Sequence, residues 1–236
     1  MRKKAIVFSV MTLILASGGF ATQANAFSSS TPITQYGSTG SPDDPDNFIK
    51  LINDVPDYSS PEFFHLGYDN NCYPTALTNL ILYWDKKYQS LVQHRSSPPD
   101  QDRVTNRISY LTGFNNTGLS HSKAKQGLQA FIAEKELADK MIVKSSRDVD
   151  IKTVEQQIYK GNPLILGVDR YKFNGHRGFE GGGGHAVIIT GVIRVGETTN
   201  LIIQDGWLPT SKILIINWDD VVEMGIQNIL YIDTYS

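Results

Sequence analysis

Cysteine is almost absent from this chain. Cys72 is the only one among 236 residues, so no disulfide can form within the chain. Small extracellular scaffolds held together by disulfides are therefore excluded as a fold class. A zinc module built on several cysteines is excluded too, because such sites need a set of cysteine and histidine ligands at short spacings.

An excess of charge of one sign is also lacking. The chain has 22 basic and 24 acidic side chains, which gives a formal net charge of −2. Proteins that bind nucleic acid through its phosphates carry a clear basic excess, so we expect no nucleic-acid partner. The four glycines at 181–184 are not followed by a Lys-Ser/Thr pair or by a helix, so they do not form a phosphate-binding loop.

Long hydrophobic runs are lacking after the first residues of the chain. The run at residues 5–16 is shorter than the ~20 residues that a bilayer-spanning helix needs. Basic residues at 2–4 precede it and Ala-Asn-Ala follows at 24–26, which is typical of a secretory signal peptide over residues 1–26. A retained membrane anchor is the alternative. We expect cleavage, a secreted or cell-surface protein, and no membrane contact after the signal peptide is removed.

Residues 27–61 are rich in Ser, Thr, Pro, Gly and Asp. This composition predicts a flexible N-terminal arm or a short pro-segment. Within it, only a short stretch around Phe48–Ile52 is expected to dock on the rest of the protein.

Residues 72–91 have the periodicity of an amphipathic helix. Its apolar positions follow the spacing i, i+3, i+4, i+7 and i+11, at Leu77, Leu80, Ile81, Trp84 and Tyr88. The other, polar side carries Thr78, Asn79, Asp85 and Lys86. Three further helices are predicted, over residues 102–111, 120–141 and 150–160.

Short β-branched runs separated by turn residues follow Pro163. They predict strands over residues 164–168, 185–192, 201–204, 212–217 and 229–232. Because the helices come first and the strands second, the fold class is α+β, with an N-terminal helical part packed on a mostly antiparallel β-sheet.

Cys72 lies where the first of these helices begins. Asn70 and Asn71 are candidate N-caps, and Pro74 is tolerated only in the first turn. A helix N-terminus favours a thiolate, which is the reactive form of cysteine. Its free N–H groups can also hold the oxyanion that forms when a carbonyl is attacked. The alternatives are a buried core cysteine or one that pairs with another molecule.

A nucleophile needs a base, and His185 is the best placed of the five histidines. It stands between the four glycines and an apolar strand, which would hold its ring rigidly. Asp205 ends the next strand, where a carboxylate could fix the tautomer of the imidazole. The alternatives are a surface loop that contains a histidine by chance and an ordinary Asp-Gly turn.

Taken in this order, the motifs resemble those of the papain-like cysteine peptidase superfamily. They are Asn71-Cys72-Tyr73-Pro74-Thr75-Ala76, Gly184-His185-Ala186-Val187 and Asp205-Gly206-Trp207, together with the strand entry at 161–167. The bacterial peptidases that remove double-glycine leaders from exported peptides are the most similar branch. The resemblance implies a papain-like domain over residues 62–236.

Within that family, the resemblance makes Cys72 the nucleophile, His185 the general base and later acid, and Asp205 the orienting group. Trp207 would shield the His185–Asp205 pair from water, with ordinary sheet packing as the alternative. The implied partner is a peptide or protein substrate, and no cofactor is implied. The sequence gives no prediction of the oligomeric state.

One position departs from the family pattern. The family usually has Gln six residues before the nucleophile as an oxyanion donor, and this chain has Leu66 there. Asn70 or Asn71 could supply the amide instead, and Asn70 is the candidate that we name, although both residues are also good caps or turn residues. Tyr73 stands where relatives often have Gly, which would narrow the approach to the thiol.

These observations favour a secreted cysteine peptidase that works by a Cys-His-Asp mechanism through a thioester. Two alternatives stay open: a transglutaminase-like acyltransferase and a catalytically inactive papain-like binding module. A metal site formed by His176, Glu180 and His185 is not expected, because the spacing matches no zinc pattern.

Overall fold

The computed structural model describes residues 39–43, 47–68, 70–94, 97–170, 184–207 and 213–235. The expected signal peptide, the first part of the N-terminal arm, and His176 and Glu180 lie outside these residues. Within the described ranges, no helix combines the length and apolar character needed to cross a bilayer.

The sheet has seven strands and every pairing between them in the described residues is antiparallel. The strands are β1 (Asn47–Leu51), β2 (Met141–Ser146), β3 (Leu164–Val168), β4 (His185–Val195), β5 (Thr198–Gln204), β6 (Ile213–Asn217) and β7 (Ile226–Thr234). Their order is β2-β7-β3-β4-β5-β6, and β1 pairs with the second half of β4, beyond the part that pairs with β3.

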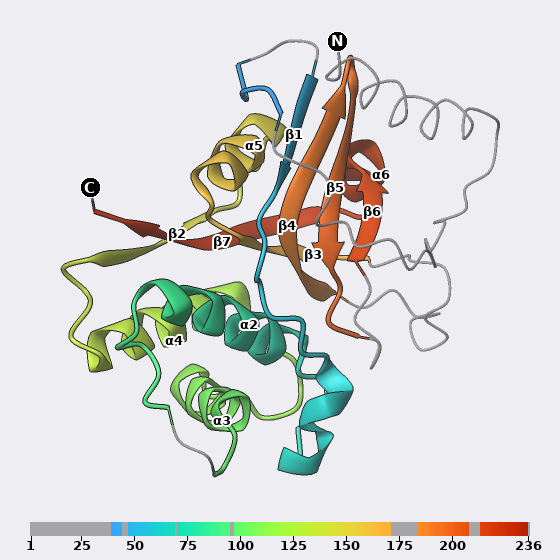
Figure 1. The fold of residues 1–236 in the computed structure, drawn as a ribbon. Helices are drawn as coiled ribbons and strands as arrows, with labels where there is room; N and C mark the ends of the chain where they lie inside the picture. The colour runs from blue at the N-terminus through green and yellow to red at the C-terminus, as the bar shows by residue number, and fades with distance from the viewer. Residues whose placement is uncertain are drawn as a thin grey trace.

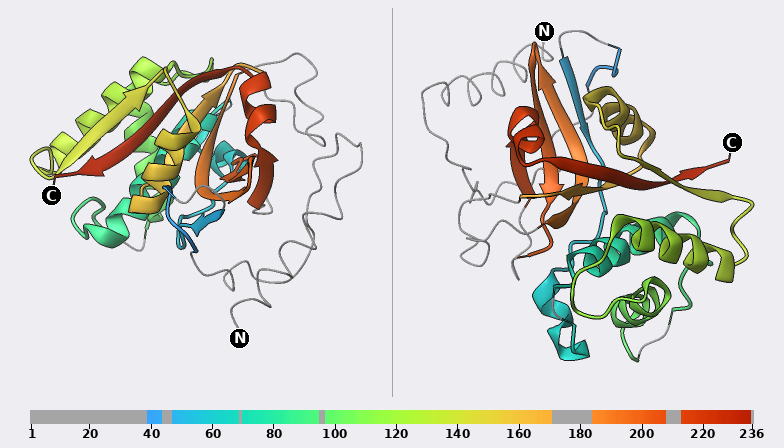
Figure 2. Two further views of the ribbon diagram at one scale, coloured as in Figure 1. Left: turned by 90° about the horizontal axis from the view of Figure 1, so that it is seen from above. Right: turned by 180° about the vertical axis from the view of Figure 1, so that it is seen from behind.

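The described residues form six helical segments. They are η2 (Ser60–Leu66, a 3-10 helix), α2 (Cys72–Lys87), α3 (Asp100–Thr112), α4 (His121–Glu134), α5 (Ile151–Lys160) and α6 (Trp218–Glu223). Of these, α5 and α6 pack on the strands apart from the other four. Figure 1 shows α2, α3 and α4 gathered below the sheet, and Figure 2 shows the same grouping from behind. Because α2 packs on β3 and β4, the helix that carries Cys72 meets the strand that begins at His185. The predicted α+β fold class is confirmed.

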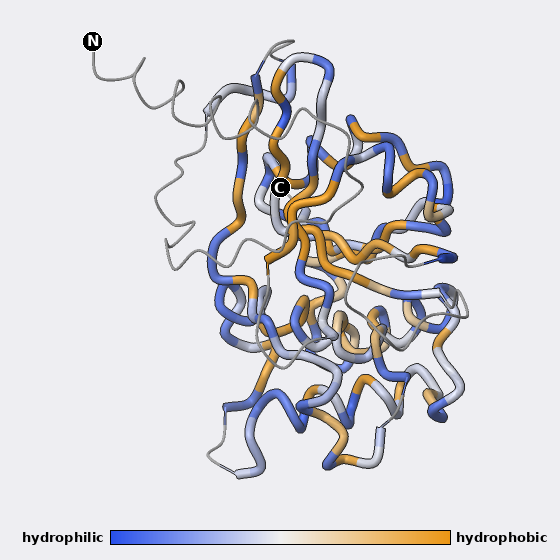
Figure 3. The backbone as a smooth tube through the Cα atoms, turned by 90° about the vertical axis from the view of Figure 1, so that its right-hand side faces the viewer, coloured by the Kyte–Doolittle hydropathy of each residue, from blue (hydrophilic) through white to orange (hydrophobic). Residues whose placement is uncertain are grey.

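The central strands form the core of the sheet. All five residues of β3 and the first eight of β4 are buried. Figure 3 shows hydrophobic stretches, in orange, that run through the middle of the molecule. Successive side chains of a strand point to opposite faces, so an unbroken buried run means that both faces are covered. His185 therefore starts its strand inside the protein and is only 3% exposed.

Several elements differ from the sequence predictions. The helix predicted over 120–141 ends at Glu134, and Met141–Ser146 is the strand β2. A turn with Glu136 at φ +56° breaks the helix, and the pairing of β2 with β7 then decides the conformation. The segment expected to dock near residues 48–52 is the strand β1, so the sheet already begins within the predicted arm of residues 27–61.

The polar side of α2 is a solvent face only at Lys86. Thr78, Asn79 and Asp85 are at most 4% exposed. Thr78 shares a hydrogen bond of 2.8 Å with Thr105 on α3, and Asp85 accepts one of 2.7 Å from the backbone N–H of Val92. Periodicity separates polar from apolar positions, but it does not reveal that a polar side is covered by other polar groups.

Candidate active site

Cys72 is the first residue of α2, as predicted, and forms no disulfide; the residue as a whole is half-buried. Backbone N–H groups of Ala186, Tyr73 and Cys72 itself approach the sulfur and favour the thiolate. Burial outweighs them and raises the pKa of the Cys72 thiol above its ordinary value. The helix N-terminus alone therefore does not produce a thiolate here, and Cys72 needs a base.

The residue that directly follows the predicted base lies close to this sulfur. Ala186, whose N–H approaches the Cys72 sulfur, directly follows His185 at the start of β4. The fold thus brings together two positions that are more than a hundred residues apart in the sequence. This juxtaposition depends on the packing of α2 against β4.

The His185 ring has a defined tautomer. Its Nε2 lies 2.8 Å from the backbone carbonyl oxygen of Asp205. A carbonyl oxygen only accepts hydrogen bonds, so Nε2 carries the proton and donates it. In the neutral ring, Nδ1 is then the basic nitrogen.

Asp205 is buried directly after β5, as expected for an orienting residue. The main chain of Asp205 fixes the tautomer that the sequence analysis expected its carboxylate to fix. The carboxylate oxygen Oδ1 accepts a hydrogen bond of 3.1 Å from the backbone N–H of Trp207. Gly206 between them has φ +64°, so the turn-forming alternative for Asp205 also holds. One residue thus shapes the turn and contacts the imidazole.

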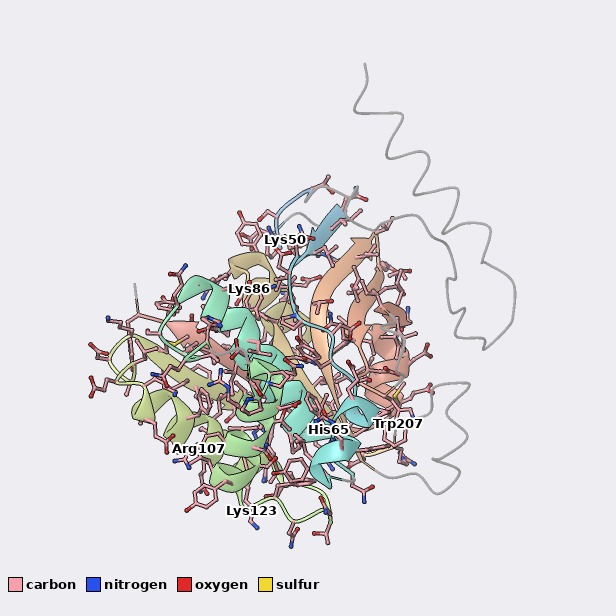
Figure 4. The ribbon with its side chains drawn as sticks, turned by 60° about the horizontal axis from the view of Figure 1, so that its bottom comes forward. Lys50, His65, Lys86, Arg107, Lys123 and Trp207 are labelled. Carbon is pink, nitrogen blue, oxygen red and sulfur yellow. The ribbon has the colours of Figure 1, made fainter. Side chains whose placement is uncertain are left out.

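Trp207 contacts the histidine ring itself. The two ring centroids are 6.1 Å apart and the planes are nearly perpendicular, at 84°. This edge-to-face arrangement is a favourable one for aromatic rings. Figure 4 shows Trp207 beside η2, at the lower right of the molecule in that view. The predicted shielding of the His185–Asp205 pair fits this position.

The two asparagines before Cys72 have different surroundings. Asn70 is exposed at φ +50°, and its amide nitrogen donates to the carbonyl of Asn116 at 3.0 Å. That hydrogen bond joins two loops and uses one of the two amide protons of the named oxyanion candidate. Asn71 is the N-cap of α2 and is fully buried, and its amide donates to the carbonyl of Ser60 at 3.2 Å.

The size of Tyr73 suggested that it narrows the approach to the thiol, but its side chain points into the protein instead. Its side chain is buried and its hydroxyl donates to Oδ1 of Asn228 on β7 at 2.8 Å. Gly167 on β3 makes room for this contact, because a Cβ there would lie 2.9 Å from the Tyr73 hydroxyl. Sequence reasoning missed this pair, although a glycine inside a strand is a known sign of a close approach.

Metal ligands are the remaining question for the site. The described residues contain no group of three or more His, Cys, Asp and Glu side chains placed to hold a metal ion. His176 and Glu180, which the sequence analysis weighed, lie outside the described residues.

Comparison with solved structures gives matches of low sequence identity. A putative C39-like peptidase from Bacillus anthracis is 14% identical, with a TM-score of 0.50 over 80% of this chain and 99% of that one. The peptidase domain of Streptococcus ComA, a bifunctional ABC transporter involved in a quorum-sensing pathway, is 14% identical, with a TM-score of 0.38 over 79% and 98%. Xylellain, a cysteine protease from Xylella fastidiosa, is 14% identical, with a TM-score of 0.39 over 85% and 99%.

A search of curated protein sequences finds no match. The model of the Peptidase_C39 like family, in contrast, matches residues 52–223, which include Cys72, His185 and Asp205. This match covers well over half of the chain and agrees with the helix-then-sheet architecture. The chain therefore belongs to the Peptidase_C39 like family and is a papain-like cysteine peptidase.

Proposed function

We propose that this protein is a secreted or cell-surface peptidase that cleaves peptide bonds with Cys72 as nucleophile and His185 as general base. The observation that carries the proposal is the hydrogen bond of 2.8 Å from His185 Nε2 to the Asp205 carbonyl. It leaves Nδ1 as the basic nitrogen of a histidine whose neighbour Ala186 approaches the Cys72 sulfur. The expected signal peptide at residues 1–26 supports export.

In the first half of the reaction, Nδ1 of His185 takes the proton of the Cys72 thiol. The sulfur attacks the carbonyl carbon of the substrate, a C–S bond forms, and the carbonyl oxygen becomes an oxyanion. The backbone N–H of Cys72, at the start of α2, is suited to hold this oxyanion. The imidazolium then gives its proton to the leaving amine as the C–N bond breaks.

In the second half, His185 takes a proton from water, and the hydroxide attacks the thioester carbon. The C–S bond breaks, the carboxylic acid leaves, and the proton returns to the sulfur. Asp205 has two parts in this cycle: its carbonyl holds the ring in one tautomer, and its carboxylate keeps the turn in shape.

An inactive binding module is the second candidate. It is favoured by Leu66, which stands where the family has its oxyanion glutamine, and by the engagement of Asn70 with Asn116. Loss of one oxyanion donor typically lowers kcat by roughly 10²–10³. The proposal is therefore a slow peptidase rather than an efficient one.

Turnover of a quenched fluorescent peptide library by the wild type, Cys72→Ala and His185→Ala tests the proposal. We expect slow cleavage by the wild type and none above background by either variant. Equal ligand binding by wild type and Cys72→Ala, with no turnover by either, would establish the binding module instead. Adding an amine identifies an acyltransferase, which would form an amide product in place of the free acid.

Alkylation by iodoacetamide gives an independent measure of the Cys–His pair. In the wild type, Cys72 should react near neutral pH, because His185 accepts the thiol proton. In His185→Ala it should react only above the ordinary thiol pKa of about 8.5, because burial raises the pKa of Cys72. Identical pH profiles for the two proteins would contradict the role of His185.

A further inference from the structure

Residues 55–60 run between the helix of Cys72 and the turn that holds His185. We call Val55–Ser60 the strap. None of its six residues lies in a helix or strand except Ser60, which begins η2. Buried backbone groups outside regular structure need other hydrogen-bond partners, and those of the strap find them on both halves of the site.

On the helix side, the strap contacts one row of polar residues on α2. Asn71, Thr75 and Asn79 are four residues apart, so they lie on one face of the helix, and each is at most 2% exposed. Asn79 holds the backbone of Tyr58 with two hydrogen bonds: its amide donates to the Tyr58 carbonyl at 2.8 Å, and its Oδ1 accepts from the Tyr58 N–H at 3.1 Å.

The end of the strap is held by the same row. Asn71 donates to the Ser60 carbonyl at 3.2 Å, and the hydroxyls of Thr75 and Ser60 are 3.3 Å apart. The row therefore contacts the strap at two places, Tyr58 and Ser60, over two turns of α2. Of the polar positions of α2 named from the sequence, only Asn79 belongs to this row, because Thr78 contacts α3 and Asp85 contacts Val92.

On the sheet side, the strap is joined to the turn after β5. The N–H of Ser60 donates to the carbonyl of Gly206 at 2.6 Å. The side chain of Gln204 donates to the carbonyl of Val55 at 3.2 Å. Gln204 and Gly206 flank Asp205, whose carbonyl holds the His185 ring.

We propose that the strap positions the nucleophile helix against the histidine turn, and that Asn79 is a positioning residue for catalysis. This inference rests on the proposed function of Cys72 and His185. Asn79 lies two turns along α2 from Cys72, so it acts only through the strap. Loss of its two hydrogen bonds releases the backbone of Tyr58. The resulting displacement of the strap is passed by the Ser60–Gly206 hydrogen bond to the Asp205 carbonyl, which orients the imidazole.

Asn79→Leu tests this, because leucine has a similar shape and can make neither hydrogen bond. Thr78→Val is the matched control: Thr78 is buried on the same helix, but its hydroxyl bonds Thr105 on α3 and not the strap. We expect kcat for peptide cleavage to fall roughly 10- to 100-fold in Asn79→Leu with KM nearly unchanged, since small misplacements of reacting groups cost this much. Thr78→Val should keep kcat within a few-fold of the wild type.

The pH profile of iodoacetamide alkylation separates positioning from stability. Asn79→Leu should shift the alkylation profile of Cys72 toward that of His185→Ala. Thr78→Val should keep the wild-type profile even if its Tm falls as far as that of Asn79→Leu. Equal profiles for Asn79→Leu and Thr78→Val would overturn the inference and leave the proposed function intact. Full turnover by Cys72→Ala would overturn both.

Thr75 provides a second pair of variants if Asn79→Leu does not fold. Thr75→Val removes the hydroxyl next to Ser60 and keeps the side-chain shape, whereas Thr75→Ser keeps the hydroxyl. We expect a shift of the alkylation profile in Thr75→Val, in the same direction, and a wild-type profile in Thr75→Ser. Identical profiles in the two variants would count against the strap.

Discussion

At the scale of single residues, the contact between Asp205 and His185 leads to a specific expectation. The imidazole donates to the backbone carbonyl of Asp205, and this bond does not depend on the side chain. In Asp205→Asn, the amide oxygen can still accept from the Trp207 N–H, so the turn is kept as well. We expect Asp205→Asn to retain most of the wild-type kcat.

The expected effect of Asp205→Asn can be compared with the effect of the same exchange in a catalytic triad whose side-chain carboxylate fixes the tautomer of the histidine. There, the same exchange lowers kcat about 10⁴-fold. Steady-state cleavage of the best library peptide by wild type and Asp205→Asn decides between the two cases. A loss of that size would show that the carboxylate, not the carbonyl, orients His185.

Gly167 is a second residue whose environment allows a prediction. A Cβ at this position would lie 2.9 Å from the Tyr73 hydroxyl and 3.0 Å from Asn228 Oδ1. Overpacking of a buried site typically costs about 1–3 kcal/mol, so Gly167→Ala should lower the free energy of unfolding by this amount. Urea denaturation measures it.

A double-mutant cycle identifies the clash as the cause. Tyr73→Phe removes the hydroxyl, so Gly167→Ala should cost less in the Tyr73→Phe background than in the wild type. Additive costs would mean that the Tyr73 hydroxyl is not what excludes a side chain at Gly167.

At the scale of elements, two histidines attach α3 to its neighbours. His94 lies between Asp85 of α2 at 2.9 Å and Asp100 of α3 at 2.6 Å. His65 of η2 lies 3.0 Å from Asp102 of α3, and its other ring nitrogen is 2.8 Å from the Glu62 carbonyl. Because both nitrogens of each ring face acceptors, the charged imidazolium fits both places.

The pKa of His65 is raised, mainly by its hydrogen bond to Asp102, and the pKa of His94 is raised, mainly by its hydrogen bond to Asp100. A histidine with a raised pKa stabilises the fold below its unfolded pKa of about 6.5, and this contribution is lost as the pH rises through the folded value. Tm should therefore fall from mildly acidic to mildly alkaline pH more in the wild type than in a His65→Gln/His94→Gln variant.

The comparison with this double variant is needed because His121 acts in the opposite direction. Burial lowers the pKa of His121, so its contribution is lost as the pH falls. His121 is present in both proteins, and its effect cancels in the difference. Parallel Tm curves for the wild type and the double variant would contradict the prediction.

The strand β1 lies within residues 27–61, which the sequence predicted to be a flexible arm or a short pro-segment. Phe48 in β1 is only 1% exposed, and β1 pairs with β4 over five residues. Arg194 of β4 also donates to the carbonyl of Pro42 at 2.9 Å. Removal of β1 as part of a pro-segment would expose this side of β4.

We therefore expect the active form to keep β1, whatever happens to the residues before it. Intact-mass measurement and N-terminal sequencing of the active exported protein check this, and the first residue should lie before Asn47. Phe48→Ala should cost about 3–5 kcal/mol of unfolding free energy, as for other buried phenylalanines. An active form that begins after Leu51 would contradict the prediction.

At the scale of the whole molecule, local signals predicted the elements that are locally determined. The helix capped by Asp150 and ended by Gly161, and the strand Leu164–Val168, lie where the sequence placed them. Their caps and β-branched runs act over a few residues, so no distant partner is needed to recognise them. The strand β2 was missed, because its conformation is set by pairing with β7 at the far end of the chain.

The sequence by itself determined the α+β order of helices and strands and the start of a helix at Cys72, and it predicted Cys72, His185 and Asp205 as the candidate site residues. These features depend on residue type and short spacing, which can be recognised without coordinates. Only the tertiary structure decided that a main-chain oxygen of Asp205 holds the imidazole, that Asn70 joins two loops, and that Asn79 of α2 binds the strap. Each of these depends on which atoms meet across segments far apart in the chain, and residue spacing contains no information on that.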